Sequence, residues 1–303
     1  MYKAKRRTLQ LNAQLAQTLT EKGVEASSDE TTTALVDKVA EISGGTQYPE
    51  NALLVFTDYD DEGFPTTLIY NCPDTETLPS LLYSGNPTSG QLSYRIKKVV
   101  LPDYVTKINA FTFSGISGLE EVTNWQSITY IDNGAFSVNN NPYDKGKSLQ
   151  YTNFPSELAY IGHTAFFRNL RNMHSEIPDT VTYIGNLAFQ YGGNQDWKIT
   201  KLPPYLTYIG QSAFMCYRQL LISEIPASVD FIGRQAFDGR LDKTSLTTVT
   251  FKGTPTTVEA DAFISNNALT DIYVPWSEGE VANAPWGAIN ATIYYNHTDT
   301  EES

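Results

Sequence analysis

The chain has few of the residues that commonly anchor metal binding or redox chemistry. Its 303 residues include two cysteines, Cys72 and Cys216, and three histidines, His163, His174 and His297. Two cysteines do not make a disulfide framework, and we expect both to be small buried apolar residues. The histidines are too far apart in the sequence for the spacing of zinc ligands, so no metal or other cofactor is predicted.

Positive charge is also scarce. Charged residues make up 18% of the chain, and 34 acidic side chains against 21 basic ones give a formal net charge of −13. Because phosphate binding requires a basic surface, this balance argues against a nucleic-acid partner. No apolar run approaches the roughly 18 residues that a membrane-spanning helix needs, so no membrane partner is predicted. Basic residues near the N-terminus precede an amphipathic segment at 9–14 rather than an unbroken apolar run, and no secretion signal is predicted.

The motifs of common enzyme classes are missing as well. There is no Gly-rich phosphate loop, no Gly-x-Ser-x-Gly sequence and no cluster of His or Cys with metal-ligand spacing. Carboxylates are scattered, and nothing singles out two that would face each other across a cleft, as a glycosidase requires. The sequence therefore predicts a protein that is not an enzyme.

An internal repeat dominates the middle of the chain. The pattern Ile-Gly-x-x-Ala-Phe occurs at 161–166, 184–189, 209–214 and 232–237, with weaker copies at 108–113, 131–136 and 258–263. The spacings between successive anchor phenylalanines are 23, 30, 23, 25, 23 and 26 residues. The longest interval contains the turn-rich insertion 139–142, which we expect to leave the repeat as a loop. The anchors are Phe113, Phe136, Phe166, Phe189, Phe214, Phe237 and Phe263.

Two further positions of each unit have a physical role. A proline lies six residues before the core isoleucine in five copies, and an aliphatic residue lies three residues before it in six. We expect the proline to end a strand and fix a turn, and the glycine to allow a tight bend or a close backbone approach. One unit cannot bury its apolar face alone, so the copies must stack at about 4.8 Å per strand, with their apolar side chains in continuous columns. The sequence predicts a β-rich repeat solenoid over residues 96–270, about seven repeats long.

This array resembles the BspA-type leucine-rich repeat family, in which Ile-Pro, a following Val and then Ile-Gly-x-x-Ala-Phe define each unit. Ile177-Pro178 and Ile225-Pro226 match that opening fully. The resemblance implies a curved or slightly twisted solenoid of short strands and 3₁₀-like turns. It also implies a role in adhesion or recognition, with no catalytic site.

Residues 1–45 are predicted to form a pair of helices, at 4–22 and 29–42. The first carries Leu11, Leu15 and Leu19 on one face, and the second begins at a capping box of Ser27 and Glu30. The pair is either a cap for the open end of the solenoid or an attachment or oligomerisation element. The segments 22–27 and 33–39 also resemble the N-terminal helical segment of structural proteins of tailed phages.

Residues 46–95 are predicted to cap the solenoid with a β-hairpin. Strands at 51–57 and 66–70 flank the acidic turn Asp58-Tyr59-Asp60-Asp61-Glu62-Gly63. Closely spaced carboxylates before a glycine suggest a calcium loop, but the twelfth position, where an EF-hand has a bidentate glutamate, is Ile69. A solvated turn is the preferred interpretation, and a calcium site is the alternative.

Residues 271–303 are predicted to form an atypical C-terminal cap and a polar tail. Trp276 and Trp286 precede a strand-like segment at 291–295, and a terminal repeat has to cover the last exposed face of the core. The run 275–286 resembles C-terminal pieces that accompany these repeats in phage and prophage proteins.

An aromatic residue directly precedes the core isoleucine in the central repeats. Because neighbouring side chains of an extended segment point to opposite faces, an inward isoleucine places these rings outward. An exposed ladder of rings suits sugar rings or an aromatic-rich protein partner. The alternative is that the rings only pair across strands and stiffen the solenoid. The candidate ligand-binding residues are Tyr130, Tyr160, Tyr183, Tyr208 and Phe231.

These features favour a non-enzymatic phage or prophage tail protein that recognises a bacterial surface glycan or protein through the solenoid. Its N-terminal helices would contact other virion proteins, and homo-oligomers are compatible with this arrangement. The first alternative is a BspA-like adhesin at the bacterial cell surface. The second is a purely structural virion component, which a ladder buried against a neighbouring subunit would favour.

Overall fold

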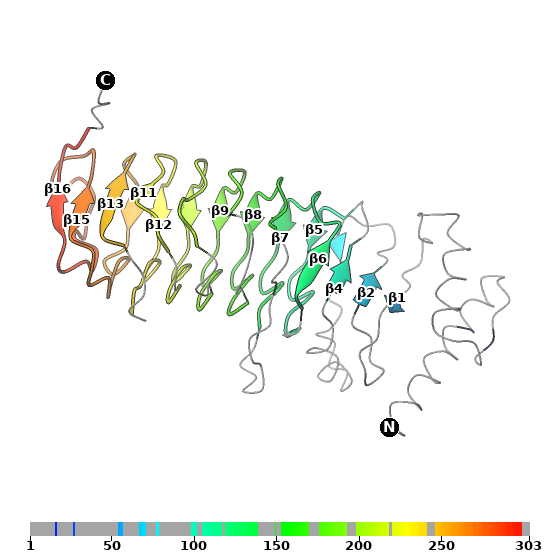
Figure 1. The fold of residues 1–303 in the computed structure, drawn as a ribbon. Coiled ribbons are helices and arrows are strands. Elements are labelled where there is room, and N and C mark those ends of the chain that lie inside the picture. The colour runs from blue at the N-terminus through cyan, green and yellow to red at the C-terminus, as the bar shows by residue number, and fades with distance from the viewer. Residues whose placement is uncertain are drawn as a thin grey trace.

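The computed structural model of the chain describes residues 16, 27, 54–56, 67–70, 77–78, 98–101, 105–116, 119–138, 149, 153–169, 176–192, 198–217, 220–240 and 246–298. These residues form a rod of stacked chain turns, with β1 and β16 at opposite ends (Figure 1). Residues one repeat apart in the sequence are therefore neighbours in space. The predicted repeat solenoid is confirmed.

One strand from each turn enters a sheet of eight short strands. All neighbours in this sheet are parallel and in register, so Tyr183 on β9 lies opposite Tyr160 on β8 and Tyr208 on β10. In sheet order the strands are β14 (Thr257–Val258), β12 (Phe231–Ile232), β10 (Tyr208–Ile209), β9 (Tyr183–Ile184), β8 (Tyr160–Ile161), β7 (Tyr130–Ile131), β5 (Lys107–Ile108) and β3 (Thr77–Leu78).

Two sheets of four strands accompany the long sheet, one towards each end of the rod. The first is β1 (Leu54–Phe56), β2 (Thr67–Tyr70), β4 (Lys98–Val100) and β6 (Glu121–Thr123). The second is β11 (Glu224–Ile225), β13 (Thr248–Phe251), β15 (Asp271–Tyr273) and β16 (Thr292–Tyr294). Among the strands that the structure describes, β1 and β2 alone pair antiparallel. They lie within the two segments predicted as strands, 51–57 and 66–70. Because β2 and β3 join these sheets, the sheets also extend N-terminal to residue 96.

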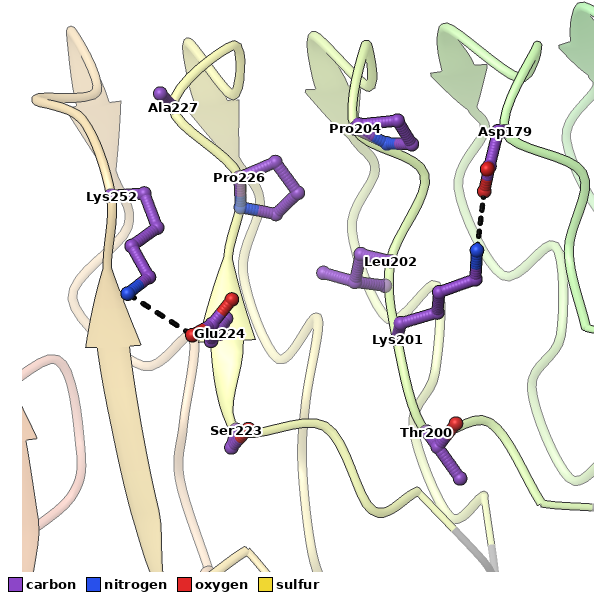
Figure 2. A pocket seen from close by; sticks show the side chains of 10 residues that line it. All are labelled: Asp179, Thr200, Lys201, Leu202, Pro204, Ser223, Glu224, Pro226, Ala227 and Lys252. Atoms are coloured by element: carbon purple, nitrogen blue, oxygen red, sulfur yellow. Dashed lines mark hydrogen bonds and ion pairs between the residues drawn. The ribbon is translucent and has the colours of Figure 1, made fainter. Parts of the chain in front are cut away.

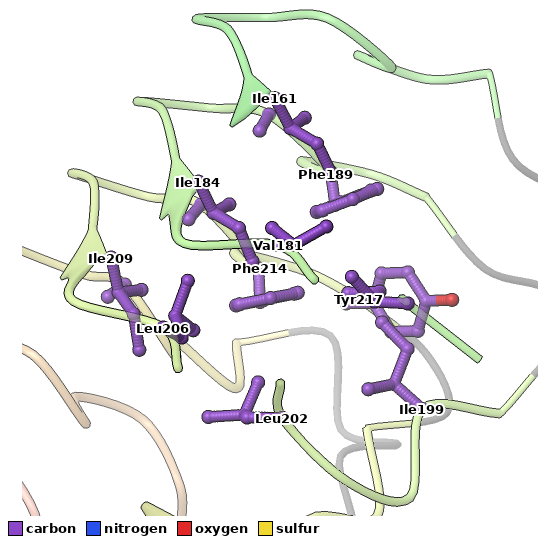
Figure 3. Packing of buried hydrophobic residues seen from close by; sticks show 14 of the residues in the cluster. Ile161, Val181, Ile184, Phe189, Ile199, Leu202, Leu206, Ile209, Phe214 and Tyr217 are labelled. Atoms are coloured by element: carbon purple, nitrogen blue, oxygen red, sulfur yellow. The ribbon is translucent and has the colours of Figure 1, made fainter. Parts of the chain in front are cut away.

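The anchor phenylalanines form the centre of the core. Each of the seven has an exposed fraction of 1% or less, and neighbouring rings stack with centroids 5.0 to 5.7 Å apart. The backbone N–H of Phe189 donates to the carbonyl of Ala213 on the next turn at 2.8 Å, and the other anchors repeat this contact. Figure 3 shows Phe189 and Phe214 beside the isoleucine column that includes Ile184 and Ile209. Stacking thus satisfies the backbone and buries the side chains together.

The repeated proline and glycine act at two different bends. The carbonyl of Pro178 accepts a 3.1 Å hydrogen bond from the N–H of Val181, and Pro155, Pro203 and Pro226 make the equivalent contact, so each proline begins a tight turn. The glycine permits a close approach between turns: a β-carbon on Gly210 would lie 2.4 Å from the backbone nitrogen of Asn186. Of the two explanations predicted for the glycine, the close approach is the one observed.

Two buried tryptophans lie at the C-terminal end of the core. Trp276 and Trp286 have exposed fractions of 3% and 0%, and their rings lie 5.1 and 5.7 Å from the ring of Phe251. The predicted strand at 291–295 is β16. A loop that includes Asn283 and Pro285 passes beside β14, where Asn283 donates to the carbonyl of Val258 at 3.5 Å. Among the described strands, β14 is the last one of the eight-stranded sheet at this end.

Several predicted features lie outside the described residues. Of the two predicted helices, only Ala16, which is helical and buried, is described, together with the exposed Ser27 that precedes the second helix. The two-helix segment, the acidic turn at 58–63 and the insertion at 139–142 therefore stay predictions. Within the described part of the chain, no helix has the length and apolar character needed to cross a bilayer. The same residues contain no group of three or more His, Cys, Asp or Glu side chains placed to hold a metal ion.

Candidate ligand-binding surface

The five predicted ladder residues form one continuous row on β7, β8, β9, β10 and β12. The ring centroids of Tyr130 and Tyr160 are 4.1 Å apart, and the later steps measure 4.6, 4.6 and 4.8 Å. The planes of neighbouring rings differ by 2° to 6°. Because strands of one sheet are about 4.8 Å apart, parallel in-register pairing itself places each ring on the next.

The rings lie on the outside of the eight-stranded sheet. Each ladder residue is partly exposed, whereas the isoleucine that follows it has an exposed fraction of 0%. The alternation of a two-residue strand therefore gives the predicted placement, with isoleucine inward and the aromatic ring outward. This placement is confirmed, and the ligand-binding role of the ladder stays a prediction.

Stacking changes what the ladder offers to a ligand. We expected flat ring faces to be available for sugars, but in the centre of the row both faces of each ring contact neighbouring rings. A ligand there meets ring edges and hydroxyl groups instead. Lys107 and Thr257 occupy the ladder position on the flanking strands β5 and β14, so the aromatic row has two defined ends.

The tyrosine hydroxyls interact along the row. Burial and then a hydrogen bond to Tyr130 raise the pKa of Tyr160 to about 12. Burial, followed by the neighbouring Tyr160 and Tyr208, raises the pKa of Tyr183 to about 12. The Tyr183 hydroxyl also lies 3.3 Å from Nε2 of His163. These phenols are therefore neutral at physiological pH, where they act as hydrogen-bond donors and acceptors rather than as acids or bases.

Polar side chains border the ladder in two columns. One residue before the ring position, the hydroxyl of Thr207 donates to the carbonyl of Thr182 at 3.0 Å. Three residues after the ring position, Oδ1 of Asn186 accepts from the N–H of Gln211 at 2.9 Å. These columns were not predicted from the sequence, although the polar residue after each repeat glycine recurs with the same period as the rings. The column after the ring comprises Asn133, His163, Asn186, Gln211 and Arg234.

A groove of about 500 Å³ lies on another part of the rod (Figure 2). Nζ of Lys201 contacts Asp179 at 2.7 Å, and Nζ of Lys252 contacts Glu224 at 3.0 Å. The groove could not be predicted from the sequence, because its residues come from separate repeats and form no common sequence motif. Its lining consists of Asp179, Thr200, Lys201, Leu202, Pro204, Ser223, Glu224, Pro226, Ala227 and Lys252.

Cys216 is buried, as predicted, and forms no disulfide among the described residues. Burial and then the nearby Asp238 raise the pKa of its thiol, so it is poorly suited to act as a nucleophile. Cys72 lies outside the described residues.

The repeat units match a known family along most of the solenoid. Six copies of the BspA type leucine rich repeat region match within residues 91–143 and 137–270, which together span more than half of the chain. The chain belongs to the BspA-type leucine-rich repeat family. The matched residues include the strands from β4 to β14 of the described structure. Comparison with curated proteins finds no significant match.

Several solved structures are similar to this BspA-type chain at low identity. A leucine-rich repeat protein from Bacteroides ovatus is 15% identical, with 80% of this chain and 75% of that chain covered and a TM-score of 0.39. A leucine rich cell surface protein from Faecalibacterium prausnitzii is 17% identical, with coverage of 74% and 68% and a TM-score of 0.39. A leucine-rich repeat protein from Eubacterium ventriosum is 18% identical, with coverage of 82% and 77% and a TM-score of 0.37.

Proposed function

We propose that this BspA-type protein is a non-enzymatic recognition protein that binds a bacterial surface ligand through the aromatic ladder. The observation that carries the proposal is the continuous row of partly exposed rings with hydroxyl edges, bordered by two polar columns. Such a surface offers many hydrogen-bonding groups at a constant spacing along the rod. It therefore suits an extended ligand, such as a glycan chain or a protein segment, that follows the axis of the solenoid.

We further propose where this recognition takes place, on a phage particle or on the bacterial cell surface. Residues 22–27, 33–39 and 275–286 resemble segments of phage and prophage structural proteins, which favours a virion tail protein. Membership of the BspA-type family favours a cell-surface adhesin as the second candidate. Immunogold labelling of phage particles and of intact cells, with one antibody against the solenoid, separates the two settings.

The test of the ladder uses binding of the purified protein to intact bacterial cells. The sharpest variant replaces Tyr160, Tyr183 and Tyr208 with phenylalanine, because this removes three hydroxyls and keeps the stacked rings. We expect cell binding to fall about tenfold or more, since three hydrogen bonds to the ligand are lost. The melting temperature should stay close to that of the wild type. Tyr205→Phe is the matched control, because Tyr205 is 68% exposed and lies outside the ladder.

A second variant replaces Tyr160, Tyr183 and Tyr208 with alanine, which removes the rings as well as the hydroxyls. If the alanine variant loses stability while both variants bind cells like the wild type, the rings only stiffen the solenoid. A variant that lacks residues 1–45 should still bind cells if the solenoid alone carries recognition. If the full-length protein binds none of the bacterial cells or glycans tested, a purely structural virion component becomes the better explanation.

A further inference from the structure

The groove in Figure 2 has a regular pattern of charge. Asp179, Lys201, Glu224 and Lys252 come from four consecutive turns and alternate in sign along the rod. Ion pairs join the first to the second and the third to the fourth. The groove is therefore lined by two ammonium groups and two carboxylates whose charges cancel.

The groove exists because the backbone ladder is interrupted between two turns. Among the described residues, β11 is an edge strand whose single sheet partner is β13. The side of β11 that faces residues 200–202 therefore carries no partner strand. Just before the groove, Ile199 and Leu220 of these neighbouring turns form an isolated parallel β-bridge. The opening is thus a property of the fold and not of one side-chain conformation.

The floor and the rim of the groove differ in chemistry. Leu202 is 5% exposed and forms the apolar floor, and the exposed Pro204 and Ala227 and the partly exposed Pro226 add apolar groups around it. The rim is polar: the side chains of Asp179, Lys201 and Glu224 are 56%, 55% and 59% exposed. The hydroxyl of Thr200 donates to Glu176 at 2.7 Å, and Ser223 is exposed on the other side. Donors and acceptors therefore lie close together above an apolar surface.

We propose that this groove is a second binding site, separate from the ladder, and that it takes an uncharged saccharide. A sugar ring is neutral, has hydroxyls that both donate and accept hydrogen bonds, and has an apolar face of C–H groups. These three properties match the cancelled charges, the polar rim and the apolar floor. An anionic ligand fits less well because both lysines already have carboxylate partners.

The existing ion pairs do not oppose such binding. The side chains of Lys201, Asp179 and Glu224 are more than half exposed, and ion pairs at exposed positions contribute little to stability, so these side chains can rotate to meet ligand hydroxyls. A volume of about 500 Å³ lies within the range of small-molecule sites. The turn that carries the exposed Tyr205 connects the groove residue Pro204 to the ladder residue Tyr208. The groove and the ladder are therefore close along the chain, and a ligand could contact both.

Titration of the full-length protein with neutral trisaccharides tests the proposal, followed by ligand-observed NMR and calorimetry. The probes are cellotriose, maltotriose, mannotriose and N,N′,N″-triacetylchitotriose, with trigalacturonate as the charged comparator. We expect at least one neutral probe to bind in the millimolar range and more tightly than trigalacturonate. Ala227→Trp should fill the groove and weaken that binding about tenfold or more. Because Ala227 is exposed, this change should not unfold the protein.

Two further variants distinguish the groove from other surfaces. Lys201→Ala should weaken saccharide binding, whereas Lys98→Ala should not, because Lys98 forms the same kind of cross-turn ion pair with Glu121 at 3.2 Å outside the groove. The phenylalanine variant of the ladder should keep full trisaccharide binding. The proposal is overturned if no neutral probe binds, or if Ala227→Trp and Lys201→Ala bind like the wild type. Cell binding through the ladder would be unaffected by that failure.

Discussion

The backbone N–H of Phe263 donates a 2.9 Å hydrogen bond to the carbonyl of Trp286. One turn earlier, the N–H of Phe237 makes the same contact with the carbonyl of Ala262. Trp286 therefore takes the position of the repeat alanine in the last turn, and Gly287, with φ of 86°, takes the position of the next anchor phenylalanine. The column of anchor rings ends at this glycine, and the large indole of Trp286 closes the core beside it.

Replacing Trp286 with alanine should destabilise the protein by about 3 to 5 kcal/mol, because it leaves a cavity at the open end of the core. Urea denaturation followed by circular dichroism measures the change. Tyr205→Ala should shift the curve by less than about 0.5 kcal/mol, since that ring is 68% exposed. A Trp286→Ala variant as stable as the wild type would show that the indole is not needed to close the core.

Gly210→Ala tests the close approach between turns. The new β-carbon would lie 2.4 Å from the backbone nitrogen of Asn186, so the two turns must move apart at a cost of about 3 kcal/mol or more. Gly279→Ala is the matched control, because Gly279 has φ of 85° and nothing within 4 Å of its β-carbon position. That control should lose only about 1 to 2 kcal/mol, the cost of a left-handed conformation. Equal losses in thermal denaturation would contradict the steric explanation.

Asn266 joins two turns near the C-terminal end. Its Nδ2 donates to the carbonyls of Phe237 at 2.6 Å and Phe263 at 3.0 Å, and the residue is 5% exposed. Asn266→Leu keeps a similar volume but removes the donor, so buried carbonyls lose a partner at a cost of about 1 to 3 kcal/mol. Asn290→Leu serves as the control, because Asn290 donates to the carbonyl of Asn267 from an exposed position. Chemical denaturation should show a clear loss for the first variant and little change for the second.

The ladder predicts a loss of stability at high pH. Burial, followed by neighbouring tyrosines, raises the pKa of Tyr160 and Tyr183 from 10 to about 12, so the folded protein holds these phenolic protons more tightly than the unfolded chain. Their contribution to stability is therefore complete below about pH 10 and is lost as the pH rises through about 12. Melting temperatures measured across this range should fall less steeply for Tyr160→Phe and Tyr183→Phe than for the wild type. If both variants show the same pH dependence as the wild type, burial in the ladder does not raise the pKa of these phenols.

Much of the core and the placement of the ladder could be predicted because both depend on periodicity. Phe189 and Ile184 recur at fixed positions of the unit, and alternation within a strand then assigns Tyr183 to the opposite face. The left-handed conformation of Leu187, with φ of 56°, could not be predicted, since leucine rarely adopts it and the glycine of this turn, Gly185, lies two residues earlier. The packed solenoid imposes this conformation at the same position in several turns.

Repetition along the chain therefore settles the unit, the inward columns and the outward row of rings, because stacking is the only way for such units to bury their apolar faces. The distance between neighbouring turns determines which side chains of different repeats come into contact. It brings Tyr160 within 4.6 Å of Tyr183, which covers the ring faces and leaves hydroxyl edges for a ligand. It also pairs Lys201 with Asp179 across two repeats and leaves a groove beside β11. These contacts join residues more than 20 positions apart, so they exist only once the turns are stacked.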